Sequence, residues 1–183
     1  MIVLLIVLAI VVALVIYIVV TYNGLIRLKN RIEAAWAQID VQLKRRFDLI
    51  PNLVETVKGY AAHERETLDA VITARNRAMS ASGPQQAADG DNMITQALGR
   101  LFALSEAYPD LKANQNFQAL QEELVSTEDK VGYARQFYND SVFKYNAKIQ
   151  SFPGVIFANV MGFKPREYFE ADDESRGPLR VEF

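Results

Sequence analysis

The chain has no cysteine and only one histidine among its 183 residues. Without cysteine it can form no disulfide, thiol nucleophile or cysteine metal site; this fits a reducing compartment and permits an oxidising one. Helical metalloprotease motifs and di-iron helix bundles both require a second histidine. In the HERET run, Thr67 stands where the partner of His63 would be needed, so we expect His63 to be a solvated surface residue.

A basic excess and a glycine-rich phosphate loop are also missing. Lysine and arginine number 20 against 22 acidic residues, a net charge of −2, whereas a nucleic-acid binder normally carries a basic stripe. Serines are present, but no base is placed to activate one. We therefore expect a non-enzymatic protein with no metal, no cofactor, no small-molecule substrate and no nucleic-acid partner.

Residues 1–22, MIVLLIVLAIVVALVIYIVVTY, contain no charge, proline or glycine. About 20 apolar residues at 1.5 Å each span the roughly 30 Å hydrocarbon core of a bilayer. A cleaved signal peptide is disfavoured because no basic residue precedes the run, and the bulky Tyr17, Tyr22 and Asn23 occupy or follow its end. The run predicts a retained transmembrane anchor with the membrane boundary near residues 21–23.

The first cations after the anchor are Arg27, Lys29 and Arg31, and none precedes it. By the positive-inside rule, the N-terminus is predicted outside and the bulk of the chain in the cytoplasm. These three side chains are also our candidate contacts with anionic lipid headgroups in the bilayer.

Long amphipathic helices are predicted after the anchor. Pro51 leaves two alternatives for the first one, a kinked continuation or a restart capped by Asp48, and the surviving register favours continuation. The apolar positions of this first stripe are Leu25, Leu28, Ile32, Trp36, Ile39, Leu43, Phe47 and Ile50.

Residues 80–92 have the composition of a loop, after which Asp91 is predicted to cap a helix that ends at Tyr108-Pro109. A second long stripe runs from about Asn114 to Pro153-Gly154, interrupted at Thr127 and Glu128 by either a buried polar contact or a narrow place. We find no strand. The prediction is an all-α protein: an N-terminal transmembrane helix (1–22) continuing into an elongated antiparallel helical bundle (23–169), then a mobile acidic tail (170–183).

Two further segments have open interpretations. The cationic triplet of residues 44–46 is either a solvated face or a binding surface for an acidic partner or the tail; that candidate partner surface comprises Lys44, Arg45, Arg46, Asp48 and Asn52. The aromatic segment after residue 151 either folds back to cap the open end of the bundle or offers an apolar surface to a partner, a sister subunit or the membrane interface. Its candidate contact residues are Phe152, Val155, Phe157, Met161 and Phe163.

Several motifs resemble the LemA family of bacterial membrane proteins. They are Tyr22-Asn23-x-Leu25, Ala35-Trp36, IDVQLKRRFDLIPNLVETVKGYAAHE at 39–64, YPDLKANQNFQALQEELVSTE at 108–128, and Arg135 followed by YNDSVFKYN at 138–146. The resemblance covers nearly all of residues 22–169. It implies a single N-terminal transmembrane helix in the bacterial cytoplasmic (inner) membrane, with the N-terminus outside, followed by an α-helical bundle; it implies no established catalysis.

Two functions compete on these grounds. The first is a non-enzymatic membrane scaffold that forms a homo-oligomer or organises other membrane proteins. The alternative is an adaptor or regulatory subunit of a membrane enzyme, such as a protease or phosphatase, which would be contacted through residues 44–52.

Overall fold

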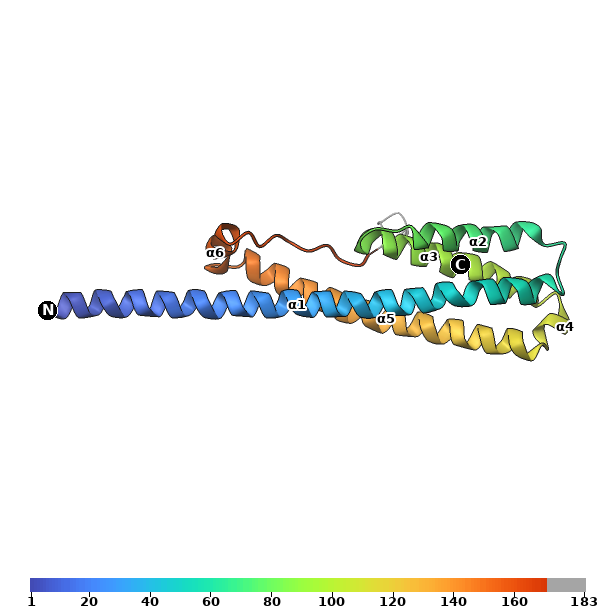
Figure 1. Cartoon of the computed structure of the whole chain (residues 1–183), viewed down its shortest axis with the longest axis horizontal. Coiled ribbons are helices and arrows are strands. Elements are labelled where there is room, and N and C mark those ends of the chain that lie inside the picture. Colours follow the sequence, from blue (N-terminus) through green and yellow to red (C-terminus); the bar gives the residue numbers. More distant parts are fainter. Residues whose placement is uncertain (171–183) are drawn as a thin grey trace, which may run out of the picture.

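The computed structural model describes residues 1–170, which form an elongated all-helical rod without a strand (Figure 1). This confirms the predicted fold class. The helices of this part of the chain are α1 (Ile2–Lys58), α2 (Arg65–Met79), α3 (Pro84–Ser105), α4 (Pro109–Lys112), α5 (Gln115–Gln150) and α6 (Gly154–Val160).

Helix α1 is continuous over 57 residues, through both Gly24 and Pro51. At 1.5 Å per residue it is about 85 Å long. Pro51 removes one backbone hydrogen bond, but its ring is exposed and its neighbours Ile50 and Leu53 are fully buried, so packing on both sides holds the helix together. The structure thus has the continuation and not the restart at Asp48.

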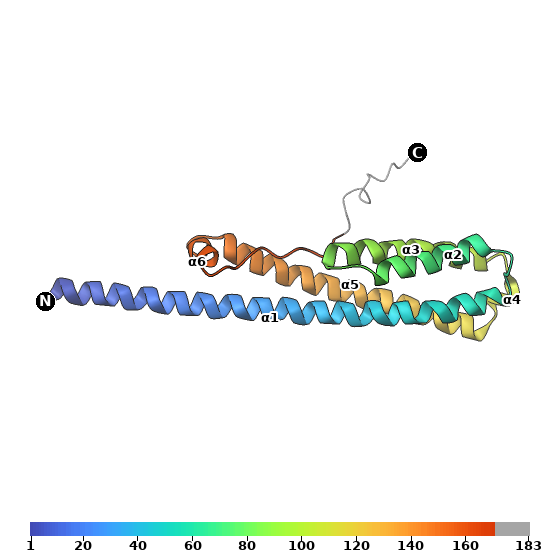
Figure 2. The same cartoon turned by 45° about the horizontal axis from the view of Figure 1, so that its top comes forward.

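The body of the rod is an antiparallel pair, α1 with α5, and the α2–α3 hairpin covers one side of it over the half farther from the N-terminus (Figures 1 and 2). The half nearer the N-terminus is therefore a pair of helices rather than a four-helix bundle. Both predicted stripes face this interface. Its fully or almost fully buried members include Leu25, Ile32, Ile39, Leu43 and Ile50 on α1 and Phe117, Leu124, Val131, Val142 and Ile149 on α5.

The predicted loop at 80–92 is wrong, because α3 already begins at Pro84 and the connection is only residues 80–83. Gly83 turns the chain with a φ of +86°, Pro84 takes the first helical turn, where no backbone N–H is required, and the glutamines and alanines that follow are good helix formers. Asp91 is consequently not an N-cap. It lies inside α3, with 8% of its surface exposed.

Gly90 explains how a residue that weakens helices fits inside α3. A Cβ atom built on it would lie 2.8 Å from the Cα of Ala78 on α2, closer than real side chains approach. Glycine here lets the two helices of the hairpin pack backbone to backbone, which offsets its poor helix propensity.

Helix α5 begins where the sequence predicts it. The side chain of Asn114 accepts a hydrogen bond from the backbone N–H of Phe117 at 3.0 Å, satisfying one of the free donors of the first turn. After α6, residues 164–169 run back along α5 as an extended segment, which we call the strap (Figure 1). The predicted mobile tail falls, apart from Glu170, on residues 171–183, outside the described part of the chain.

Two asparagines of α5 hold the strap by its backbone. Asn146 donates to the carbonyl of Arg166 and accepts from its N–H, both at 2.9 Å, and Asn139 makes the same pair with Phe169 at 3.2 and 2.8 Å. Seven helical residues rise about 10 Å, and three extended residues also span about 10 Å. The two spacings match, so both asparagines engage the strap in one register.

Candidate membrane-proximal site and partner surfaces

Helix α1 is the one helix in residues 1–170 that is long and apolar enough to cross a membrane. None of the residues in its most apolar stretch is buried within the protein, and nearly every side chain of residues 1–20 is exposed. Burying so much apolar surface requires either lipid or another protein. We refer to residues 1–22 as the anchor.

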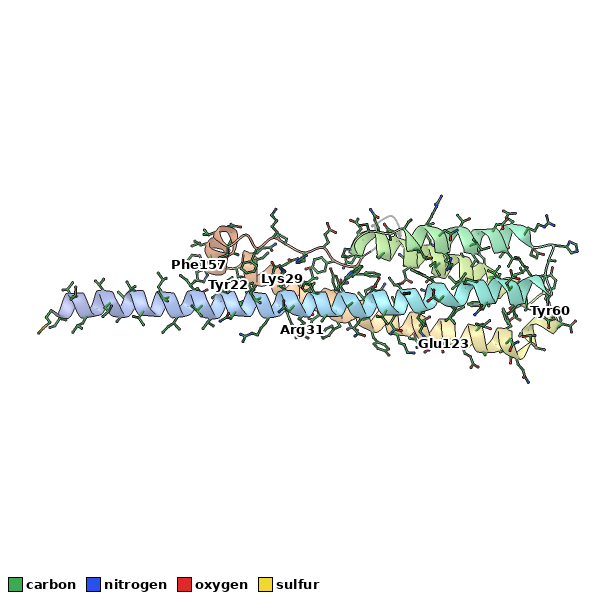
Figure 3. The ribbon with its side chains drawn as sticks, in the orientation of Figure 1. Tyr22, Lys29, Arg31, Tyr60, Glu123 and Phe157 are labelled. Carbon is green, nitrogen blue, oxygen red and sulfur yellow. The ribbon has the colours of Figure 1, made fainter. Side chains whose placement is uncertain are left out.

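Helix α6 folds back against the base of the anchor (Figure 3). The ring of Phe157 lies 5.9 Å from that of Tyr17, and the ring of Phe163 lies 5.8 Å from that of Tyr22. The small residues Gly154 and Ala158 of α6 are buried, and a Cβ atom on Gly154 would lie 2.6 Å from the carbonyl oxygen of Lys148 on α5. The inward side of this segment thus behaves as the predicted cap of the open end.

The outward side of α6 remains apolar and uncovered. Phe152, Ile156 and Val160 are exposed by 81%, 53% and 84%, respectively. Of the predicted contact residues, Phe152 and Met161 lie on the exposed side, whereas Val155, Phe157 and Phe163 are half-buried. The sequence analysis did not include Ile156 and Val160, although their four-residue spacing places both on one face of α6.

The three predicted headgroup contacts do not form one cluster. Arg27 is exposed, while the guanidinium of Arg31 stacks over the ring of Phe137, 4.5 Å from its centroid. Lys29 lies 4.0 Å from Glu33 and lines a recess of about 380 Å³. The other residues of that recess are Tyr145, Gly162, Phe163, Lys164, Pro165 and Arg166. The recess is cationic but partly neutralised, because Arg166 lies 3.6 Å from Glu33.

The cationic triplet 44–46 splits in three directions, as consecutive helical residues must. Lys44 is exposed, and Arg45 pairs with Glu123 across the gap to α5. Arg46 has no exposed surface, so its prediction as part of a partner surface is wrong. Lys44, Asp48 and Asn52 are exposed at four-residue steps and remain together as one ridge.

Arg46 instead ties three helices together inside the bundle. It donates to Asp91 of α3 at 2.5 Å, to Thr95 of α3 at 2.9 Å and to Glu128 of α5 at 3.2 Å. Burial raises the pKa of Asp91 above its ordinary value, while the charge of Arg46 and its hydrogen bond pull that pKa back down. At the interruption of the second stripe, Thr127 is buried and donates to the carbonyl of Leu124, whereas Glu128 is exposed and reaches Arg46 from the edge of the bundle.

The outer face of α5 carries an exposed ridge that the sequence analysis missed. Val125, Tyr133 and Phe137 are exposed by 50%, 75% and 46% and follow one another at multiples of four residues. Beside the ridge is an open hollow lined by Gln121, Glu122, Val125, Ser126, Asp129, Lys130 and Tyr133. We call residues 121–137 on this face the α5 ridge. In the sequence, the ridge corresponds to apolar residues of α5 that do not fall on the positions of the buried stripe.

Within residues 1–170, no three histidine or acidic side chains come together in a way that could hold a metal ion. His63 is exposed at the far end of the rod, as predicted. The largest perturbations among tyrosines have structural causes. Burial raises the pKa of Tyr138, whose hydroxyl donates to the carbonyl of Glu167 in the strap, and that of Tyr145, which packs against Phe163. A hydrogen bond to Glu64 raises the pKa of Tyr108.

Comparison with known proteins gives a consistent result. A family model described as the LemA family matches residues 35–183. The magnetosome protein MamQ of Magnetospirillum gryphiswaldense is 27% identical over 184 residues, which cover 86% of this chain and 68% of that protein. Protein LemA of Metamycoplasma hominis is 28% identical over 134 residues, covering 71% of this chain and 60% of that one.

Proposed function

The chain belongs to the LemA family, and from this premise we propose that it is a single-pass membrane scaffold that self-associates through the α5 ridge. The apolar N-terminal helix and the relatives together make it a membrane-associated protein. The proposal adds that residues 1–22 cross the bacterial cytoplasmic membrane once, and that the helical rod projects from it as the assembling part.

The α5 ridge carries this proposal. Large side chains at Val125, Tyr133 and Phe137 are exposed beside a hollow, and the guanidinium of Arg31 covers part of the Phe137 ring. Such a patch on a soluble rod favours association with a complementary protein surface. The adjacent charges, Asp129 and Lys130, are of opposite sign and could pair across a contact between two copies.

The continuity of α1 makes a second copy a fitting partner. The rod continues the anchor without a break (Figure 1), so two copies in the same membrane would stand parallel, with equal residues at equal heights. A two-fold axis along the rods would then bring one α5 ridge against the other, as an isologous contact requires. Confinement to the bilayer also raises the effective concentration of one copy near another.

The native mass of the full chain tests the scaffold. We expect the protein, extracted from its own membrane in polymer nanodiscs and measured by mass photometry, to contain more than one copy. Tyr133→Glu should reduce it to a single copy by placing a charge in the contact. Phe143→Glu is the matched control, because Phe143 is also a largely exposed aromatic residue of α5 (61%, against 75% for Tyr133) and lies outside the ridge. A wild-type protein that is uniformly a single copy would contradict self-association.

The adaptor alternative has a separate structural basis. The exposed row of Lys44, Asp48 and Asn52 on α1 offers alternating charged and polar groups to a partner. Identification of every chain in the same nanodiscs distinguishes the two functions. A foreign membrane enzyme present in stoichiometric amount would favour the adaptor, whereas a pure homo-oligomer favours the scaffold.

The orientation follows from the cations after the anchor, and we propose that the rod is cytoplasmic. A cysteine in place of Ser82, in the exposed turn between α2 and α3, would be the only thiol in the chain. We expect a membrane-impermeant maleimide to label it only after the cells are permeabilised. Labelling in intact cells would place the rod on the outside.

A further inference from the structure

The segment between α5 and the strap is uncharged over residues 151–163, SFPGVIFANVMGF. Its small residues Gly154 and Ala158 are buried, and Gly154 lies against the backbone carbonyl of Lys148 at the end of α5. Phe152, just before α6, and Ile156 and Val160 within it are exposed and make up its outer face. Two apolar faces on one short helix are unusual for a segment that ends in water. We therefore expect this exposed apolar face to be covered by lipid or by another protein.

The height of this segment along the anchor indicates the occupant. Phe163 touches Tyr22, at the predicted membrane boundary, and Phe157 touches Tyr17, five residues deeper into the apolar run. Five residues of helix correspond to about 7.5 Å of depth along the axis, which lies within the 5–10 Å at which interfacial helices settle. If the anchor is in lipid at Tyr17, the segment beside it meets the same lipid.

The charges around the segment support this position. Lysines stand at both of its borders: Lys148 on α5, whose Nζ reaches across the backbone at Gly24, and Lys164 at the start of the strap. Arg166 follows two residues later. Cationic side chains at the edges of an apolar segment can reach the phosphate level of a bilayer while the apolar part lies beneath it.

We propose that residues 152–163 form a second membrane contact, a short interfacial wedge that inserts Phe152, Ile156 and Val160 into the leaflet from which the rod emerges. The wedge rests on the proposed function in one respect, since it requires the anchor to cross the bilayer. It would fix the tilt and rotation of the rod relative to the membrane, because the rod is then held at two points rather than one. Fixed rotation would direct the α5 ridges of neighbouring copies in the plane of the membrane.

Spin labels on single cysteines test the wedge in the full chain. We would label Ile156→Cys and Val160→Cys in vesicles of phosphatidylcholine and phosphatidylglycerol, and measure collisions with oxygen, which concentrates in lipid, and with a neutral nickel chelate, which stays in water. Three references calibrate the scale: Val12→Cys in the anchor, Ser82→Cys in the exposed turn and Ala158→Cys in the buried contact. No native thiol needs to be removed.

We expect the oxygen-to-nickel ratio at both wedge positions to approach that of the anchor reference and to exceed that of the turn several-fold. Nickel accessibility like that of the turn would overturn the wedge while the anchor reference still reports lipid. Low accessibility to both reagents, as at Ala158, would overturn it in favour of a protein occupant, such as a second copy. An aqueous anchor reference would instead overturn the proposed membrane span, and the wedge with it.

Discussion

Replacing Arg46 with methionine is expected to lower the free energy of unfolding by about 3–5 kcal/mol, the usual cost of removing one partner from a buried ion pair. Methionine preserves much of the length of the side chain. The loss of stability therefore comes mainly from removing the positive charge of Arg46, which leaves the carboxylate of Asp91 without its partner inside the bundle. Asp91 is 8% exposed and receives the shortest hydrogen bond of Arg46. Thermal unfolding of the full chain in nanodiscs, followed by helical circular dichroism, measures the change.

Arg45→Met is the matched control for this prediction. Arg45 is the preceding residue and also pairs with a carboxylate of α5, but more than half of its side chain is exposed. An exposed pair contributes about 0–1 kcal/mol. Equal losses for the two variants would contradict the buried network. The double variant Arg46→Met with Asp91→Asn should recover much of the loss, because neither charge is then left without its partner.

The dependence on pH provides an independent check of the same network. Burial already raises the pKa of Asp91, and removing Arg46 takes away the two larger of the three interactions that lower this pKa, leaving only the charge of Arg135. The folded variant therefore binds a proton at Asp91 more strongly than the unfolded chain does, and this contribution to stability is lost as the pH rises through the raised pKa. The deficit of Arg46→Met should be smallest in acid and grow toward neutral pH. A deficit that grows as the pH falls would contradict this assignment.

The Arg46 network also shows what hydrophobic periodicity can and cannot reveal. The spacing of apolar residues predicted α1 and α5 and their antiparallel packing, because burial of a helix face imposes that spacing. The same spacing runs through Ile39, Leu43, Arg46 and Ile50, so Arg46 occupies a core position. The sequence analysis took the charge of Arg46 to mean that its side chain is exposed, because arginine is rarely buried without partners. Those partners are interruptions in the stripes of other helices.

The start of α3 and the strap were missed for different reasons. Glycine, serine and aspartate gave residues 80–92 the composition of a loop, but Gly90 is required by the close approach of Ala78 rather than by a turn. The strap has no periodic pattern of apolar residues. It is an extended segment held through its backbone by side chains of α5, so the spacing of those side chains sets its position. The sequence feature that corresponds to the strap is the seven-residue separation of Asn139 and Asn146. This separation predicts a contact only once it is known which extended segment lies beside α5.

For the membrane-proximal surfaces, the sequence predicted which segments are apolar or cationic but not how these segments contact one another. The sequence identified an apolar segment after α5 and cations after the anchor, since both depend on residue type. It could not place Phe157 against Tyr17, because that contact depends on how the chain returns from the end of α5. The two alternatives for this segment, a cap and an exposed apolar surface, describe its two opposite faces.

Truncating Phe169 to alanine is expected to lower the free energy of unfolding by about 3–5 kcal/mol, the usual loss for a buried phenylalanine. The ring is 1% exposed and lies 6.2 Å from that of Trp36, the only tryptophan in the chain. Besides thermal unfolding, the fluorescence of Trp36 should shift to the red, because water reaches the indole when the strap no longer covers it. The matched control is Phe143→Ala, which removes an exposed ring and should change stability by less than about 0.5 kcal/mol.

A combined variant separates the role of the ring from that of the backbone clamp. Asn139→Ala removes both hydrogen bonds to Phe169 and should cost about 1–3 kcal/mol by leaving buried backbone groups unpaired. If ring and clamp hold the same end of the strap, the double variant Phe169→Ala with Asn139→Ala should lose less than the sum of the single losses. Strict additivity would mean that the ring packs independently of the clamp. The far end of the strap remains held at Asn146, so α6 should keep its contact with Tyr17 in both variants.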